Sequence, residues 1–142
     1  MLKPFLLLIC CGLAFALTGC RKGDPKLVQV DGNVVIGGKP LTTGTVIFYP
    51  DATKGNTSRE EPRGAIEPDG RYHLLTGLKD GVTPGWYKVA VTAAEQIDMK
   101  NPYITKWLVP QKYIDPKTSK LQLEVVANPA PGAYNLTLEP VK

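Results

Sequence analysis

Histidine and cysteine are scarce in this chain of 142 residues, and their positions exclude several kinds of site. His73 is the single histidine, and the three cysteines, Cys10, Cys11 and Cys20, all lie near the start. No Cys/His cluster therefore has the spacing of a zinc site. Because no cysteine follows Cys20, the rest of the chain has no disulfide, and its stability must come from a hydrophobic core.

Catalytic patterns are missing as well. Nucleophilic catalysis requires a serine or cysteine beside a base that a third group orients, and no serine here lies in a nucleophile elbow. His73 falls inside a predicted strand, which is typical of an ordinary strand histidine. Glu60, Glu61 and Asp98 have neither the spacing nor the apolar surroundings of catalytic carboxylates. The sequence therefore predicts that this protein is not an enzyme.

The chain also has no long run of one charge sign. Its 17 basic and 13 acidic residues give a formal net charge of +4 at pH 7, and they are scattered. A protein that binds nucleic acid usually has a clustered basic face or a recognisable module. Neither is visible, so we expect no nucleic-acid partner.

No apolar run is long enough to cross a membrane as a helix. The longest covers residues 5–17, which is 13 residues, whereas a membrane-spanning helix needs about 20. This run follows Lys3 and ends in small residues. A positive start, a short apolar run and a small-residue exit are typical of a secretory signal peptide, which we expect at residues 1–19.

The end of this segment reads Leu17-Thr18-Gly19-Cys20 and resembles the lipobox of bacterial lipoproteins. The resemblance implies cleavage between Gly19 and Cys20, with a diacylglyceryl group on the Cys20 thiol. Two acyl chains hold a protein stably at a membrane without any membrane-spanning helix. Residues 20–26 would then be the lipidated cysteine and a short tether.

The basic residues of this tether have two interpretations. Arg21, Lys22 and Lys26 could each gain about 1 kcal/mol near anionic headgroups, or they could form a solvated linker. In well-studied envelopes, an aspartate directly after the lipidated cysteine favours retention in the inner membrane. Arg21 stands at that position, so we expect an anchored domain in the cell envelope, periplasm-facing or surface-exposed, with the outer membrane favoured over the inner.

From residue 27 onward, apolar side chains recur with a period of two, which is typical of strands with one buried face. Turn residues interrupt the pattern roughly every ten residues, and no segment has a convincing helical period. The first two strands flank the turn Gly37-Gly38-Lys39-Pro40, and we expect them to form a hairpin. Residues 27–142 are thus predicted to be all-β, as a seven-stranded antiparallel β-sandwich. The expected strands are residues 28–36, 45–50, 63–67, 71–76, 86–92, 119–126 and 134–138.

Several segments resemble carboxypeptidase-regulatory-like domains. They are V-D-G-N-V-V-I-G-G-K-P-L-T-T-G-T-V-I-F-Y-P at residues 30–50, P-D-G-R-Y-H-L at 68–74 and P-G-W-Y-K-V-A-V at 84–91. V-P-Q-K-Y-I-D-P-K-T-S-K-L at 109–121 is similar to the C-terminal part of small bacterial lipoproteins built around such a domain. The resemblance implies a transthyretin-like, immunoglobulin-like β-sandwich. It also implies a non-enzymatic binding or structural role, since these domains carry no catalytic set.

Residues 93–118 are the longest stretch without a clear period, apart from a short helix that is possible over 93–100. Long loops in compact domains are often functional, and this one contains Tyr103, Trp107 and Tyr113. Exposed aromatic rings could stack on a glycan or anchor a protein contact. Alternatively, Trp107 covers an open end of the sandwich as part of the core. The three aromatic residues are our candidate binding residues.

The loop at residues 51–62 offers a possible cation site. Asp51, Asn56, Glu60 and Glu61 carry oxygen ligands, but the glycine and ligand spacing of an EF-hand are absent. We therefore predict no metal and no other cofactor.

These features predict a lipid-anchored β-sandwich of the cell envelope that acts as a non-catalytic interaction or structural module. The alternative is a carbohydrate-binding module held at the surface. The expected partners are the membrane, through the lipid on Cys20, and an envelope protein or glycan.

Overall fold

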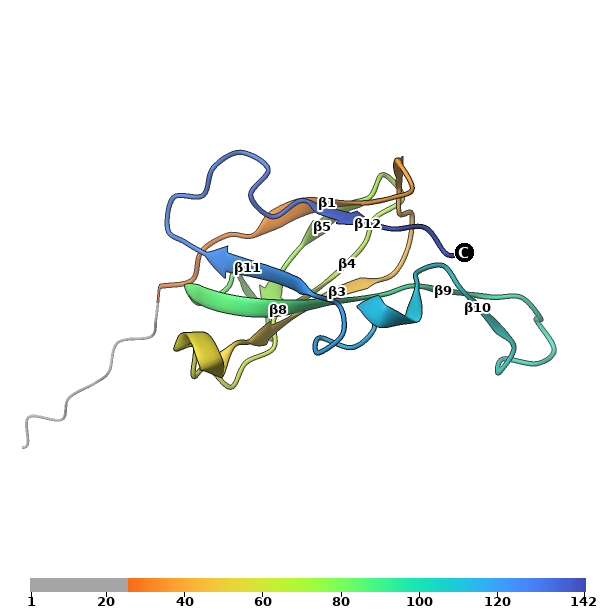
Figure 1. Ribbon diagram of the computed structural model, residues 1–142, viewed down its shortest axis with the longest axis horizontal. Coiled ribbons are helices and arrows are strands. Elements are labelled where there is room, and N and C mark those ends of the chain that lie inside the picture. Colours follow the sequence, from red (N-terminus) through yellow and green to blue (C-terminus); the bar gives the residue numbers. More distant parts are fainter. Residues whose placement is uncertain (1–25) are drawn as a thin grey trace, which may run out of the picture.

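The structure is a computed structural model that describes residues 26–142, which form strands joined by turns and two short 3-10 helices (Figure 1). The expected cleavage position at Gly19 and the expected lipidation site at Cys20 lie outside the described residues. Within residues 26–142, no helix is long and apolar enough to span a membrane. The fold class is all-β, which confirms this part of the prediction.

The larger sheet has six antiparallel strands in the order β11-β8-β3-β4-β6-β7. Its longest strand is β8 (Gly85–Thr92), where Tyr87, Val89 and Val91 alternate inward and are fully buried. This alternation is the period of two that the sequence displays. The other strands are β3 (Thr45–Pro50), β4 (Arg63–Ala65), β6 (Leu75–Thr76), β7 (Lys79–Asp80) and β11 (Leu121–Val125).

The second sheet has four strands arranged around β1 (Asp31–Ile36). β2 (Lys39–Pro40) and β5 (Arg71–His73) pair with β1 antiparallel. β12 (Leu136–Leu138) pairs with β1 in parallel. The expectation of purely antiparallel sheets is therefore wrong, because the last strand runs beside the first in the same direction.

The turn expected after the first strand is present, but it joins different strands from those predicted. Gly37 and Gly38 both have positive φ, at 56° and 81°, which suits a two-residue hairpin turn between β1 and β2. The expected hairpin between residues 28–36 and 45–50 is wrong, since β3 pairs with β4 and β8 in the other sheet. The sequence pattern gave no sign of the short strand β2.

The strand expected at residues 71–76 is divided between the two sheets. Leu74 separates β5 from β6, is fully buried, and donates its backbone N–H to the carbonyl of Val30. Gly64 on β4 approaches the carbonyl of His73 so closely that a Cβ there would clash. The chain thus passes from the second sheet to the larger sheet at Leu74, beside β4.

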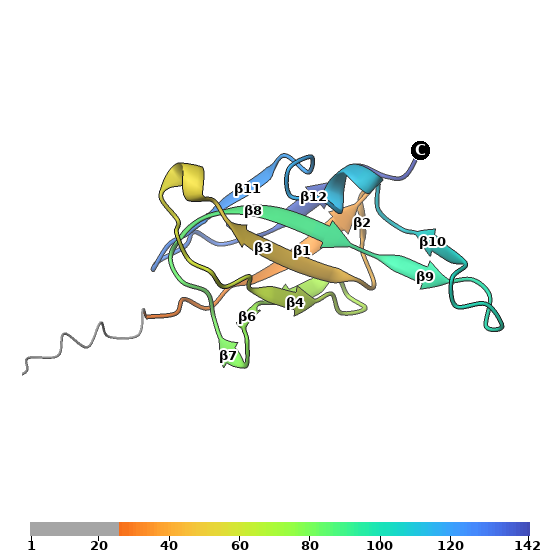
Figure 2. The same cartoon turned by 90° about the horizontal axis from the view of Figure 1, so that it is seen from below.

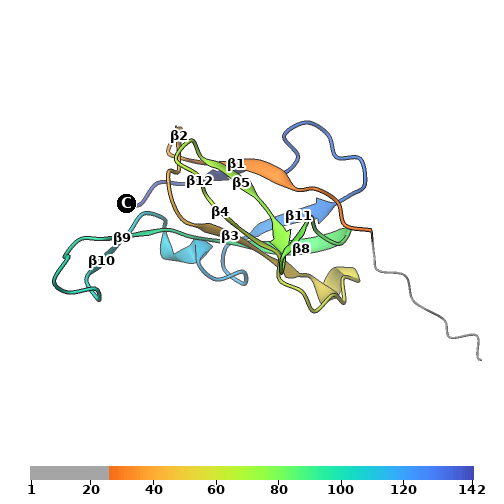
Figure 3. The ribbon, with the colours of Figure 1, turned by 180° about the vertical axis from the view of Figure 1, so that it is seen from behind.

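The buried side chains of both sheets belong to one hydrophobic cluster. Phe48 and Tyr87 are two of its largest members, with ring centroids 5.6 Å apart and both side chains fully buried. The cluster also includes Val34 from β1 and Leu136 from β12, so the two sheets share a core. Figures 2 and 3 show the sheets from two further directions.

The segment expected to be a loop, with a possible helix over 93–100, contains a β-hairpin instead. β9 (Ala94–Gln96) pairs with β10 (Thr105–Trp107), and the hairpin projects from the end of the domain opposite residue 26 (Figures 1 and 2). A 3-10 helix, η2 (Gln111–Tyr113), follows it. The other 3-10 helix, η1 (Ala52–Lys54), lies in the loop after β3.

Candidate functional site

The three aromatic candidates of residues 93–118 do not share one surface. Tyr103 is 91% exposed and Trp107 is 50% exposed, whereas Tyr113 is only 4% exposed and packs in the core. The Tyr113 hydroxyl accepts a hydrogen bond from the backbone N–H of Glu139 at 3.0 Å. Tyr113 therefore has a structural position, because η2 turns its ring inward, and the interpretation of it as a surface ligand residue is wrong.

The β9–β10 hairpin collects most of the exposed large apolar side chains in the part of the chain that the structure describes. Eight such side chains are exposed, and five of them lie on this hairpin. Met99 and Tyr103 at its tip are almost completely accessible, at 93% and 91%. We call this set the apolar hairpin cluster: Ile97, Met99, Tyr103, Ile104 and Trp107.

The turn of this hairpin satisfies much of its own backbone. The carbonyl and side chain of Asp98 accept hydrogen bonds from the N–H groups of Asn101 and Lys100, at 3.2 and 2.8 Å. The side chain and carbonyl of Asn101 in turn accept from the N–H groups of Tyr103 and Ile104, both at 3.1 Å. Several backbone groups of the tip are thus satisfied without a partner, so contacts with another molecule would be made mainly by side chains.

The register of the hairpin divides its side chains between two faces. Ala94 lies opposite Trp107, and Glu95 lies opposite Lys106. Because side chains alternate along a strand, Trp107 and the Glu95–Lys106 pair point to opposite faces. The hairpin therefore has a charged pair on one face and an aromatic ring on the other, beneath an apolar tip.

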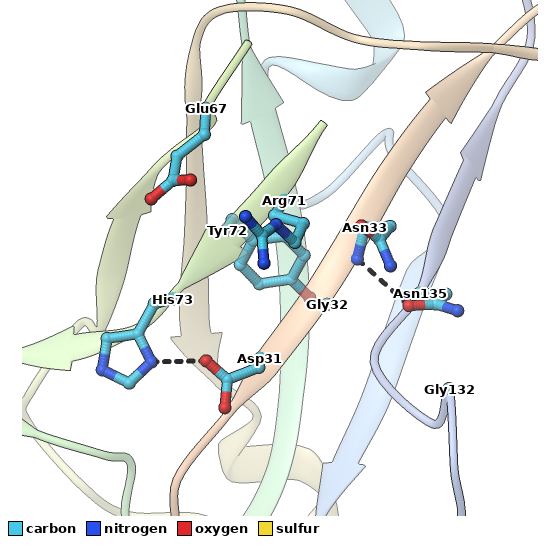
Figure 4. Close-up of a pocket in the computed structure, with 9 residues that line it drawn as sticks. All are labelled: Asp31, Gly32, Asn33, Glu67, Arg71, Tyr72, His73, Gly132 and Asn135. Atoms are coloured by element: carbon cyan, nitrogen blue, oxygen red, sulfur yellow. Dashed lines mark hydrogen bonds and ion pairs between the residues drawn. The ribbon is translucent and has the colours of Figure 1, made fainter. Parts of the chain in front are cut away.

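A polar hollow of about 450 Å³ lies over β1 and β5 (Figure 4). His73 is its most distinctive side chain: Nδ1 lies 2.6 Å from Oδ1 of Asp31, and Nε2 lies 3.2 Å from Oδ1 of Asp80. The hydrogen bond to Asp31 raises the pKa of His73, partial burial opposes this, and the Asp80 carboxylate adds to the rise. Both ring nitrogens are occupied, so the imidazole links β5 to β1 and β7.

The remainder of this hollow is built from structural contacts. Arg71 Nε pairs with Asp69 at 2.6 Å, and the backbone N–H of Asn33 donates to Asn135 Oδ1 at 3.0 Å. Gly32 forms the floor, where a Cβ would clash with the carbonyl of Tyr134. None of the residues that line this hollow is a serine, threonine or cysteine, and the hydroxyl of its one tyrosine, Tyr72, donates to the carbonyl of Tyr134.

A second hollow, of about 780 Å³, lies beside Trp86 at the start of β8. Trp86 is half-buried, and Nζ of Lys54 lies 3.7 Å from its ring centroid. The same ammonium group donates to Oε1 of Gln122 at 3.0 Å. The sequence predicts a strand at Trp86 but does not by that alone assign the ring to a face. The alternation with Tyr87 and Val89 was the signal that could have placed its ring on the opposite side from the core.

The loop at residues 51–62 does not assemble a cation site from its four oxygen-bearing candidates. Asp51 and Asn56 are buried, whereas Glu60 and Glu61 are exposed. Asn56 Nδ2 donates to the carbonyl of Trp86 at 2.9 Å, which commits that side chain to holding the loop. Within residues 26–142, no group of three or more histidine, cysteine, aspartate or glutamate residues is arranged to hold a metal ion.

One side chain in this loop has an unusual environment. Asp51 Oδ1 accepts hydrogen bonds from the backbone N–H and the hydroxyl of Thr53, at 3.1 and 2.6 Å. The hydroxyl bond lowers the pKa of Asp51, burial opposes this, and the charge of Lys88, 3.8 Å away, lowers it further. Oδ2 is buried without a hydrogen-bond partner. Asp51 therefore caps η1 as a charged carboxylate.

The described residues thus form an all-β domain with a projecting apolar hairpin, a polar hollow over β1 and β5 and a second hollow beside Trp86. No family model, no curated protein and no solved structure matches this chain.

Proposed function

We propose that this protein is a lipid-anchored module of the cell envelope that has no catalytic activity and presents the β9–β10 hairpin to another envelope protein. The observation that carries the proposal is the apolar hairpin cluster, which holds five of the eight exposed large apolar side chains of residues 26–142. Exposed apolar side chains that gather on one element indicate an interaction site, and tryptophan, tyrosine and methionine are enriched where proteins meet.

The position of the hairpin suits a protein anchored at the other end. Residue 26 enters the domain at the end opposite the hairpin (Figure 3). A lipid on Cys20 would be separated from the domain by residues 21–26, which reach at most about 20 Å when fully extended. The hairpin would then point away from the anchoring membrane. We favour the outer membrane, because Arg21 rather than an aspartate follows Cys20.

For the fold, we propose a transthyretin-like β-sandwich of the carboxypeptidase-regulatory-like group. Two features support it: the two sheets share one hydrophobic cluster, and all seven predicted strand segments contain strands. The short strands β2 and β7 and the β9–β10 hairpin would be additions to a seven-stranded framework. In this proposal the family supplies a scaffold, and the hairpin supplies the contact surface particular to this chain.

The alternative function, a surface-held carbohydrate-binding module, keeps one observation in its favour. Trp107 and Tyr103 are both exposed, as aromatic side chains that stack on a sugar must be. The predicted set of three rings is nevertheless reduced to two, since Tyr113 is in the core. Protein contact is the better-supported role for the hairpin, because it also exposes the apolar, non-aromatic side chains of Ile97 and Met99.

The test is an in-cell crosslink of the anchored protein followed by mass spectrometry. A Met99→Ser/Tyr103→Ser double variant removes apolar surface from the tip. The matched control is Leu78→Ser, since Leu78 is an equally exposed apolar residue outside the hairpin, between β6 and β7. We expect a specific envelope protein with the wild type and with Leu78→Ser, and its loss with the double variant and with Cys20→Ser. Recovery of the same envelope protein in equal amount with the double variant would show that the hairpin is not the contact element.

A further inference from the structure

The hollow beside Trp86 lies on the outer face of the six-stranded sheet, away from the hairpin. Tyr87 and Val89 are buried in the core, so Trp86 and Lys88, which alternate with them, face outward. On the neighbouring strand β11, Glu124 lies opposite Trp86 in the register. η1 and the start of β8 are at the end of the domain where residue 26 enters (Figures 1 and 3). The hollow and the hairpin are thus at opposite ends.

The indole ring of Trp86 is already in contact with a polar hydrogen donor. Lys54 Nζ lies 3.7 Å from its centroid, as expected for a cation over the electron-rich face of an aromatic ring. That face also attracts other positively polarised hydrogens, including the C–H groups along one side of a pyranose ring. A sugar that stacks on this face would displace the Lys54 ammonium, and Lys54, which is exposed and lines the same hollow, would then donate to a sugar hydroxyl.

Hydrogen-bonding groups line the same hollow as this ring, as the hydroxyl groups of a sugar require. Glu60, Glu124 and Thr57 line the hollow together with Lys54. Within the described part of the chain, the side chains of Glu60, Glu124 and Thr57 form no hydrogen bond or ion pair, so they can bond a ligand without breaking an internal contact. Two carboxylates against one ammonium give the lining a negative balance, which favours a neutral saccharide over an acidic one.

The wall of the hollow is held in place by contacts that a ligand would not disturb. Asn56 Nδ2 donates to the Trp86 carbonyl at 2.9 Å, and Asn56 Oδ1 accepts from the N–H of Ser58 at 3.1 Å. Asn56 is itself buried. A volume of about 780 Å³ lies within the range of roughly 300–1,000 Å³ found for small-molecule sites.

From these contacts we infer that the hollow beside Trp86 binds a neutral oligosaccharide segment, with one sugar ring stacked on the indole and its hydroxyl groups bonded by Glu60, Glu124 and Lys54. The site is separate from the hairpin and does not depend on the proposed protein partner. A protein anchored in the envelope would hold this site near the membrane, while the hairpin contacts a partner farther away.

The test uses the full chain in a detergent without a sugar headgroup, so that the detergent does not compete. The chain has two tryptophans, Trp86 and Trp107, so the variant Trp107→Phe reports on Trp86 fluorescence alone. Cellohexaose, chitohexaose and maltohexaose are titrated separately to about 10 mM, ten times a Kd of 1 mM. Glu124→Ala is introduced in the same background. Its matched control is Glu95→Ala, which removes an exposed carboxylate from the hairpin.

We expect saturable quenching or enhancement with at least one of the three hexasaccharides. Glu124→Ala should weaken that response at least about tenfold, whereas Glu95→Ala should leave it unchanged. Glu124 is exposed, so loss of folding does not explain a loss of binding, and circular dichroism of both variants verifies this. No response to any of the three sugars, or a response that Glu124→Ala leaves intact, would overturn the inference. The crosslinking result with the hairpin variant is independent of either outcome.

Discussion

The imidazole of His73 lies between two carboxylates from different strands, with Nδ1 at 2.6 Å from Asp31 and Nε2 at 3.2 Å from Asp80. Asp31 is the direct cross-strand neighbour of His73 in the β1–β5 pair. Asp80 comes from β7, which belongs to the other sheet. One side chain thus joins the two sheets near the edge of the domain.

This arrangement predicts that stability depends on pH. The hydrogen bond to Asp31 raises the pKa of His73 above its ordinary value of 6.5, so the folded state binds the proton more tightly than the unfolded state. The contribution of protonated His73 to the free energy of unfolding is complete below pH 6.5 and is lost as the pH rises through the raised pKa. The His73 side chain is 35% exposed, so we expect an effect below about 1 kcal/mol.

Urea unfolding of the wild type and of His73→Gln, followed from about pH 5.5 to about pH 8.5, measures this effect. The difference in free energy of unfolding between them should shrink as the pH rises. Asp31→Asn is the matched control, since it removes the main cause of the raised pKa but keeps the imidazole. A difference that is constant across this range would rule out the linkage.

Two aromatic residues of the segment that follows β8 should differ sharply in their effect on stability. Tyr113→Ala removes a ring from the core, and we expect a loss of about 3–5 kcal/mol. Trp107→Ala removes a ring that is half exposed on the hairpin, and we expect a loss below about 1 kcal/mol. Chemical denaturation of both variants tests the assignment, and a large loss for Trp107→Ala would mean that the indole packs on the domain.

Gly44 occupies a backbone conformation that few side chains tolerate, at the point where the chain enters the larger sheet. Its φ is +126°, and a Cβ there would clash with the carbonyl of Thr92 and the side chain of Ala93. We expect Gly44→Ala to cost above about 2 kcal/mol. Gly55 is the matched control: its φ is +85° but nothing lies within 4 Å of a built Cβ, so Gly55→Ala should cost only about 1 kcal/mol. Equal costs would show that crowding at Gly44 contributes nothing.

The proposed anchor is tested by fractionation. Cys20→Ser removes the thiol that would carry the diacylglyceryl group, so the domain should leave the membrane fraction, and the mass increase from the lipid should disappear. The wild type should remain with membranes after a high-salt wash and be released by detergent. Continued membrane association of Cys20→Ser after that wash would contradict the anchor.

The sequence by itself was sufficient for the all-β class and for most strand positions. Alternation along residues 86–92 and the turn residues at Pro68-Asp69-Gly70 are local signals, and both are present in the structure. Gly70, with φ at +86°, closes the turn through a hydrogen bond to the carbonyl of Glu67 at 2.8 Å. Signals of this kind work because the periodicity and the turn chemistry each act within a few residues.

Only the tertiary structure decided which strands pair and which aromatic rings are exposed. Val34 pairs with Leu136, which lies near the other end of the sequence. The sequence does not predict this pairing, because a strand has a period of two whichever strand lies beside it. The same limit applies to the sites. Trp107 and Tyr113 are six residues apart in similar sequence, yet one is on a projecting hairpin and the other is in the core. The contact of Lys54 with Trp86 likewise joins a loop to a distant strand, and such contacts depend on the folded chain rather than on local pattern.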